Sequence, residues 1–216
     1  MIIPLILILD QGLKFWIKTH LFLGEEFNVI GDWFRIHFTE NPGMAFGLEM
    51  GGKYGKLALS SFRIIAVIFI IGILIGLVRK NANGGLIFSI SLILAGAIGN
   101  IIDSAFYGLI FSESYGTAAT FLPEGGGYGT FLQGKVVDML YFPLFNFQFP
   151  EWVPFVGKSN FLFFSPVFNI ADSAITVGVF LMIVFQRKFF SKMSGKEKKE
   201  PESESVDDIS TEEATG

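Results

Sequence analysis

The 216-residue chain has no cysteine, only two histidines and few charged residues. The absence of cysteine excludes a disulfide framework, thiolate catalysis and Cys-ligated metal sites. Two histidines, His20 and His37, argue equally against a histidine-rich metal site. Only 17% of the residues are charged whereas 51% are hydrophobic, a balance that excludes a soluble enzyme, a coiled coil and a disordered chain. The sequence therefore predicts a membrane protein.

Four apolar segments are expected to cross the membrane as helices, because crossing about 30 Å of hydrocarbon takes roughly 20 residues. Residues 57–78 carry a single charge, residues 84–102 carry none, and residues 161–185 carry only Asp172. The first span starts with the apolar run 2–9. This run lacks the basic leader and the small-residue cleavage site of a secretory signal peptide, so we expect an uncleaved span.

The positions of basic residues predict how these spans are oriented. Arg and Lys cluster in the turn at residues 79–83 and directly after residue 185, which the positive-inside rule places on the cytoplasmic side. Four spans then put both termini in the cytoplasm, and the long connections at about 21–56 and 106–160 on the extracytoplasmic side. Within the first connection, the alternation of residues 33–38 predicts a strand.

The predicted domain organisation is one membrane domain followed by a tail. Residues 1–190 are expected to form the four-span domain, and residues 191–216 an acidic cytoplasmic tail. Residues 196–216 hold 8 acidic residues and 3 Lys without apolar periodicity, so we expect the tail to be disordered and without catalytic function.

Acidic residues in or near the spans are the main candidates for chemistry, because a charge in the bilayer is costly unless it is paired or hydrated. The candidates are Asp10, Asp103, Asp138 and Asp172, of which Asp138 is expected in a loop. Asp10 and Lys14 are one helical turn apart and can neutralise each other. Asn100 and Asn169 each precede an acid by three residues, which places amide and carboxylate on one helix face.

Two readings of these acids are open. They could act as polar clamps between helices. Alternatively, two carboxylates held close together share a proton, so that one activates a water and the other acts as general acid. This is aspartic protease chemistry, which needs no metal, thiol or cofactor. Serine catalysis lacks a nearby histidine, and a Ser–Lys pair with Lys53 or Lys56 has no motif behind it.

A third stretch, residues 41–47, reads as an extended or turn segment because it contains Pro and Gly. It could be a loop that re-enters the membrane. In a site, Asn41 could present its amide to a peptide backbone, and Gly43 would permit close approach.

Together these residues resemble the lipoprotein signal peptidase family, the bacterial signal peptidase II aspartic proteases. Five motifs over roughly residues 5–187 carry the resemblance: Asp10-Gln11 with Lys14, Asn41-x-Gly43-x-Ala45-Phe46, Gly99-Asn100-x-x-Asp103, Val136-Val137-Asp138 and Phe168-Asn169-x-Ala171-Asp172. The resemblance implies an endopeptidase of the bacterial inner membrane that removes the signal peptide from a prolipoprotein, before a cysteine carrying diacylglycerol. It also implies four membrane helices with a small extracytoplasmic β cradle, and an active site near the outer face.

The resemblance assigns roles that residue chemistry leaves open. It implies a catalytic dyad of Asp138 and Asp172 with Asp103 in support. The positions that shape the site or bind substrate are Asp10, Lys14, Asn41, Gly43, Asn100 and Asn169. The expected partners are the diacylglyceryl prolipoprotein and membrane lipid, with no nucleic acid and no cofactor, and we expect a monomer.

Three features depart from the family pattern. Ser104 stands where the family usually has Arg, so the ion pair that this Arg would form with Asp103 is missing. Met139 replaces a common Phe. The Gly-rich segment 106–135, with its insertion at 108–135, is expected to form a lid. The alternatives from other classes are a small proton-linked transporter or channel that uses intramembrane acids, and a chaperone that binds lipid-modified chains without cleaving them.

Overall fold

A computed structural model of the chain describes residues 2–42, 52–143, 145–148, 160–163 and 166–191. Side chains are described within residues 2–42, 55–143 and 166–185. The predicted tail, apart from residue 191, and Gly43 lie outside the described residues.

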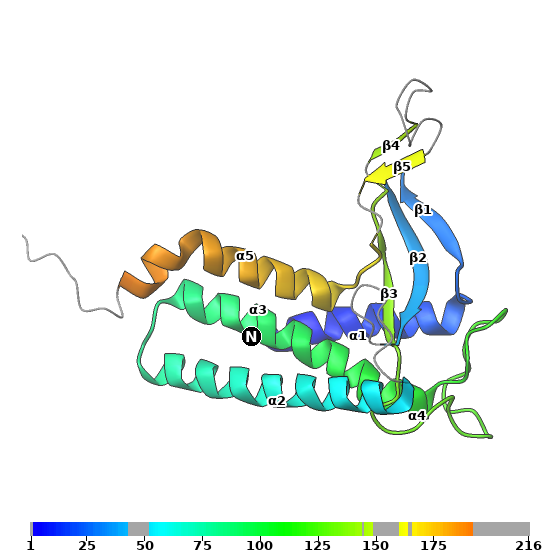
Figure 1. Ribbon diagram of the computed structural model, residues 1–216, viewed down its shortest axis with the longest axis horizontal. Coiled ribbons are helices and arrows are strands. Elements are labelled where there is room, and N and C mark those ends of the chain that lie inside the picture. Colours follow the sequence, from blue (N-terminus) through cyan, green and yellow to red (C-terminus); the bar gives the residue numbers. More distant parts are fainter. Residues whose placement is uncertain (1, 43–51, 144, 149–159, 164–165, 192–216) are drawn as a thin grey trace, which may run out of the picture.

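Four long helices form the body of the molecule (Figure 1): α1 (Ile2–His20), α2 (Gly52–Arg79), α3 (Gly84–Ile102) and α5 (Ile170–Ser191). Helix α3 is central and contacts each of the other three. Glycine allows its close approach to α5. A Cβ at Gly96 would collide with the backbone carbonyl of Ala171, and one at Gly178 would come within 2.7 Å of the Ser89 carbonyl oxygen. Such small-residue contacts are typical of helix pairs in membranes.

Two of these helical regions, Gly55–Arg79 and Gly84–Ile110, are long and apolar enough to cross a membrane. Many large apolar side chains on α2 point outward, including Phe62 and Phe69, which are 67% and 69% exposed. Outward-facing apolar residues of this size are expected where a helix faces lipid, since water would disfavour them.

The helix predictions are confirmed in the middle of the chain. They are wrong at the start of α5 and at the C-terminal end of α3. Residues 84–102 form α3 with the predicted bounds, and residues 57–78 lie within α2. The predicted fourth span starts too early, because β5 (Asn160–Phe163) occupies its first residues and α5 begins only at Ile170. An apolar aromatic run is compatible with either a strand or a helix, which explains the error.

The second error is at the C-terminal end of α3. The chain continues beyond Ile102 as a π-helical turn, η1 (Asp103–Tyr107), and the short α4 (Gly108–Ile110). The connection that we expected to start at residue 106 therefore starts after residue 110. π-Helical turns are rare and are often found at functional sites.

A three-stranded antiparallel sheet stands at one end of the bundle. Its strands, in the order β1-β2-β3, are β1 (Glu26–Ile30), β2 (Phe34–Asn41) and β3 (Val136–Tyr141). Figure 1 shows the sheet at the end opposite the turn between α2 and α3. The pair β4 (Phe145–Gln148) and β5 lies beyond it. The strand predicted at residues 33–38 is confirmed for residues 34–38, which lie in β2. The loop predicted around Asp138 is wrong, because this residue lies in β3.

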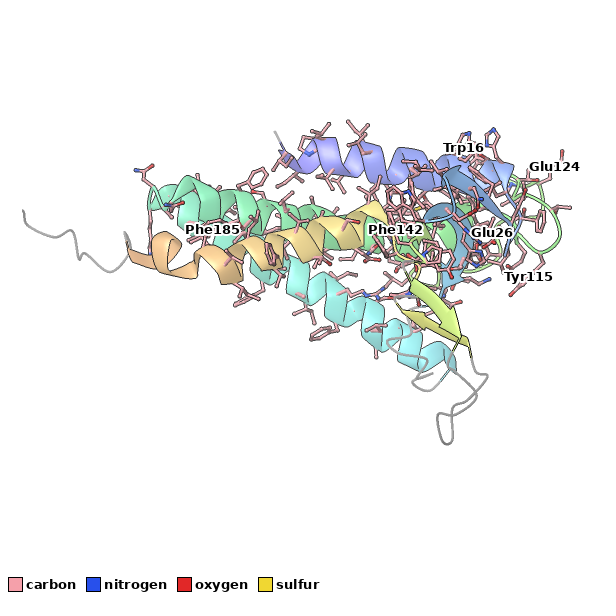
Figure 2. All side chains as sticks on the ribbon, turned by 90° about the horizontal axis from the view of Figure 1, so that it is seen from above. Trp16, Glu26, Tyr115, Glu124, Phe142 and Phe185 are labelled. Atoms are coloured by element: carbon pink, nitrogen blue, oxygen red, sulfur yellow. The ribbon has the colours of Figure 1, made fainter. Side chains whose placement is uncertain are left out.

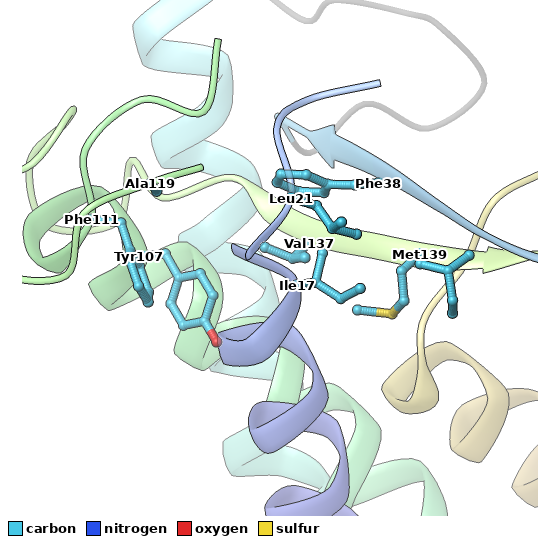
Figure 3. Close-up of a cluster of buried hydrophobic side chains, with 9 residues drawn as sticks. Ile17, Leu21, Phe38, Tyr107, Phe111, Ala119, Val137 and Met139 are labelled. Carbon is cyan, nitrogen blue, oxygen red and sulfur yellow. The ribbon is translucent and has the colours of Figure 1, made fainter. Parts of the chain in front are cut away.

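An apolar core joins the sheet to the helices (Figure 3). It contains Ile17, Leu21, Ile36, Phe38, Tyr107, Phe111, Ala119, Val137 and Met139. Met139 is fully buried in this core. Phe111 and Ala119 belong to the 106–135 segment, so this segment is packed against the ends of α1 and α3. The view from above shows the same crowding of side chains at the sheet end (Figure 2).

Candidate active site

The two predicted catalytic acids come from different elements that the backbone links directly. Asp138 is in the middle of β3, and Asp172 is in the first turn of α5. Phe168, just before α5, pairs with β3. Its carbonyl oxygen accepts from the Leu140 N–H at 2.7 Å, and its own N–H donates to the Leu140 carbonyl at 3.1 Å. The start of α5 is thereby fixed beside the strand that carries Asp138.

Asn169 connects the two acids. Its fully buried side-chain amide donates to Asp138 Oδ1 at 2.7 Å, while its Oδ1 accepts from the backbone N–H of Asp172 at 2.8 Å. The second bond caps the N-terminus of α5, where the first backbone N–H groups have no partner inside the helix. A single side chain thus caps the helix that carries one acid and holds the other acid.

Asn100 on α3 holds Asp172 from the opposite side. Its Nδ2 donates to Asp172 Oδ1 at 2.8 Å, and its Oδ1 accepts from Lys14 Nζ at 3.0 Å and from Asn169 Nδ2 at 3.2 Å. The sequence placed each amide on one helix face with the acid three residues later. The carboxylates that the amides reach belong to other elements, because Asn100 donates to the one on α5 and Asn169 to the one on β3.

Lys14 is the centre of a buried ion cluster beside the dyad. Its Nζ lies 2.9 Å from Asp10 Oδ2 and 2.8 Å from Asp103 Oδ2, and all three side chains are at most 1% exposed. The predicted neutralisation of Asp10 by Lys14 is confirmed. Lys14 also gives Asp103 an ion partner.

Hydrogen bonds from three elements complete this cluster. Asp10 Oδ1 accepts from the backbone N–H of Ala171 at 2.9 Å, and Asp103 Oδ2 accepts from that of Val137 at 3.2 Å. Gln11 donates to Asp103 Oδ1 at 2.8 Å. The supporting acids are therefore fully engaged and tie α1, η1, β3 and α5 together, whereas Asp138 and Asp172 lie where these elements meet.

The environment of Asp138 gives its carboxyl group an unusually high pKa. Burial and the nearby charge of Asp172 raise its pKa to about 7, although the Asn169 hydrogen bond and the Lys14 charge oppose this shift. Asp138 is 5% exposed, whereas Asp172 is only partly buried. Asp138 therefore keeps its proton to a higher pH than an ordinary carboxyl group does.

Arg63 on α2 is a site residue to which the sequence analysis gave no function. Its Nη1 donates to Ser104 Oγ at 3.4 Å, and of the nearby carboxylates Asp172 attracts it most strongly, followed by Asp138 and Asp103. The signal was present in the sequence, since a lone arginine inside an apolar span points to a functional site. Lys56 lies on the same helix face, where its Nζ donates to the Gln133 carbonyl at 2.5 Å. Lys56 is therefore held by backbone, which removes support for a Ser–Lys mechanism with this residue.

A second buried ion network secures the 106–135 segment. Lys18 Nζ, which is fully buried, bonds Glu40 and donates to Ser114 Oγ at 2.8 Å. Lys135 bridges Glu40 at 3.0 Å and Glu113 at 2.9 Å. The spacing of Lys14 and Lys18 by one helical turn could have predicted that both face inward. The lid expected from this segment stays a prediction.

Asn41 ends β2 opposite Val136, two residues before Asp138 on the neighbouring strand. It therefore lies beside the start of β3, close to Asp138, whereas Gly43 falls outside the described residues. Within the described residues, no group of three or more His, Asp or Glu side chains is placed to bind one metal ion.

Comparisons with known proteins identify the family of this chain. A family model described as "Signal peptidase (SPase) II" matches residues 2–188. The chain belongs to the signal peptidase II family. The lipoprotein signal peptidase of Porphyromonas gingivalis is 50% identical over 207 residues, which cover 95% of this chain and 90% of that protein. That of Amoebophilus asiaticus is 39% identical over 186 residues, which cover 85% and 75%.

Two solved structures share the fold. One, entitled "Bacterial membrane enzyme structure by the in meso method at 2.3 A resolution", has a TM-score of 0.58 and 28% identity, covering 92% of each chain. The other, of the same title at 1.9 Å resolution, has a TM-score of 0.56 and 29% identity, covering 87% of this chain and 90% of that one. Family membership makes this chain a membrane peptidase and gives no support to the transporter alternative.

Proposed function

We propose that this protein removes the signal peptide from diacylglyceryl-modified prolipoproteins by cleaving before the lipidated cysteine, with Asp138 and Asp172 as the catalytic dyad. The names of its relatives support the substrate class. The observation that supports the dyad is the link from β3 to α5 through Asn169, which contacts the Asp138 carboxylate and the backbone N–H of Asp172, two acids 34 positions apart in the chain. Asp10, Lys14, Asn41, Gly43, Asn100, Asp103 and Asn169 would support the site or bind substrate.

The different surroundings of the two acids suggest their roles. Asp172, only partly buried and near Arg63, would take a proton from the attacking water. Asp138, with its pKa raised to about 7, would be protonated and would polarise the scissile carbonyl. The tetrahedral intermediate would collapse as the leaving nitrogen takes up a proton. Cleavage should then slow as pH rises through about 7, because Asp138 loses the proton that it must donate.

The proposed topology follows from the basic turn between α2 and α3. With this turn in the cytoplasm, α1, α2, α3 and α5 would each cross the inner membrane, and both termini would be cytoplasmic. The sheet would stand on the extracytoplasmic side, where the dyad at its base would meet the outer leaflet. Residues 1–190 would form the peptidase domain and residues 191–216 the tail, and the protein would act as a monomer without a cofactor.

Cleavage of a diacylglyceryl precursor by purified protein in detergent tests this function. Asp138→Asn and Asp172→Asn should each abolish release of the signal peptide, while Glu124→Gln, on the exposed part of the 106–135 segment, should not. An unlipidated precursor should remain uncut. Full activity in either Asn variant would refute the dyad. Binding of the precursor without cleavage by the wild-type protein would favour the chaperone alternative instead.

A further inference from the structure

The 106–135 segment carries two phenylalanines that pack on the outer surface of the helices. Phe121, 46% exposed, meets the ring of Phe15 on α1 edge-on, with ring centres 5.2 Å apart. Phe131, 53% exposed, meets Phe106 of η1 in the same way at 6.0 Å. The core described above does not include either ring, although Phe121 also contacts the core residue Phe111, with ring centres 5.6 Å apart.

Each contact extends an apolar face that already points outward. On α1 the exposed large residues are Leu5, Ile8, Leu9, Phe15 and Trp16, which recur at the spacing of one helix face. On the extension of α3, Phe106 and Leu109 are 47% and 42% exposed. A membrane helix presents such a face to lipid, so Phe121 and Phe131 continue two lipid-facing surfaces.

The depth of these contacts can be estimated from helix geometry. Phe15 is five residues from the end of α1, which is about 8 Å along its axis. Phe106 is 22 residues beyond the start of α3, or about 33 Å along the axis, close to the thickness of the hydrocarbon core at about 30 Å. Both contacts therefore fall near the level at which hydrocarbon gives way to headgroups, where aromatic side chains gather.

The local backbone is arranged to keep these side chains outside. Each phenylalanine is followed by a leucine in the left-handed region, Leu122 at φ 51° and Leu132 at φ 65°. This conformation is unfavourable for residues other than glycine and persists only where the surroundings enforce it. Leu122 is held by its N–H, which donates to the Ile110 carbonyl at 2.7 Å, yet its side chain is 63% exposed.

We propose that the 106–135 segment is a membrane-surface anchor that inserts Phe121, Leu122 and Phe131 into the leaflet at the sheet end of the bundle. The lipid of that leaflet is the occupant of this apolar surface. Tyr115 and Glu124, in contrast, lie at the far end of the molecule beyond the helices, where they would face water (Figure 2). The anchor does not depend on the catalytic assignment, since none of these side chains belongs to the site.

The test uses the absence of native cysteine, which allows a spin label to be attached at single introduced cysteines. Phe121→Cys, Leu122→Cys and Phe131→Cys are labelled in lipid vesicles, with Tyr115→Cys and Glu124→Cys as controls in the same segment. Collision rates with oxygen, which concentrates in lipid, and with a water-soluble nickel chelate are then measured. The ratio of oxygen to nickel collisions should be several-fold higher at 121, 122 and 131 than at 115 and 124.

Equal ratios at all five positions, or lower ratios at 121 and 131 than at 124, would overturn the proposal. Retained cleavage of the lipidated precursor by each labelled protein confirms that the fold is intact. If a cysteine at 121 prevents folding, the neighbouring position 122 supplies the same comparison with 124. The ratio of oxygen to nickel collisions must be high at both 121 and 131. A high ratio at only one of them would show only that this label is packed against the protein.

Discussion

Replacement of Asp138 by Asn should abolish cleavage and stabilise the folded protein at neutral pH. Asn has nearly the same shape as Asp and can still accept the 2.7 Å hydrogen bond from Asn169 through its Oδ1. It cannot ionise, however, and so removes both the burial of a charge and the repulsion from Asp172. The substitution thereby separates the chemistry of the site from its effect on stability.

The size of the effect follows from the pKa of Asp138. Its rise from 3.8 to about 7 means that, between these pH values, the folded state binds more protons at this carboxyl than the unfolded state does. The free energy of unfolding therefore falls as pH rises from about 4 to about 7. At about 1.4 kcal/mol per pH unit, the loss is at most about 4 kcal/mol. That corresponds to roughly 10 °C in unfolding temperature for a domain of this size.

Thermal unfolding in detergent between pH 4 and 8, followed by tryptophan fluorescence, measures this difference. The wild-type unfolding temperature should fall between about pH 4 and pH 7, and that of Asp138→Asn should fall less, so that the curves diverge over this range and stay apart above it. Asp138→Ala, which also deprives the Asn169 amide of its acceptor, should be less stable than the Asn variant. Parallel curves for wild type and Asp138→Asn, or full cleavage activity in that variant, would refute the reasoning.

Three further substitutions test the supports of the site. Lys14→Met leaves two buried carboxylates without their cation and should destabilise the protein by about 3–5 kcal/mol, measured by thermal unfolding. Arg63→Gln should lower kcat with little change in KM, whereas Arg63→Lys should keep most of the activity; equal kcat in both variants would exclude a role for the charge. Gly134→Ala would drive a Cβ into the backbone carbonyl of Asp103 and should cost about 1–3 kcal/mol, while Gly125→Ala, which has open space, should cost little by the same measurement.

The sequence predicts well what depends on local pattern. The bounds of α3 agree because an uncharged run follows Asn83, whose side chain accepts from the Gly85 N–H at 2.8 Å and caps the helix. The strand around His37 is recognisable from its alternation. The start of α5 was misplaced because residues 160–163 are aromatic and apolar, which suits a strand as well as a helix.

Interactions between residues far apart in the chain could not be predicted from local sequence patterns. The i, i+4 spacing predicted the pair of Asp10 and Lys14, but not that Lys14 would also pair with Asp103, which is 89 positions further along the chain. The choice of partner for Asn100 also depends on how α3 packs against α5. The dyad itself was identified from family resemblance, since composition alone offered four acids and no means of choosing two.

The attachment of Phe168 to β3 has a consequence for how mutations would act on this enzyme. Three residues separate this backbone pairing from the carboxyl on α5, so the spacing of the acids is set by a short local link. Neither the pairing of Phe168 with β3 nor the Asn169 cap of α5 involves a residue of helix α2. Substitutions on the outward face of α2 would therefore lower the amount of folded protein in the membrane. The kcat of the folded molecules would stay normal.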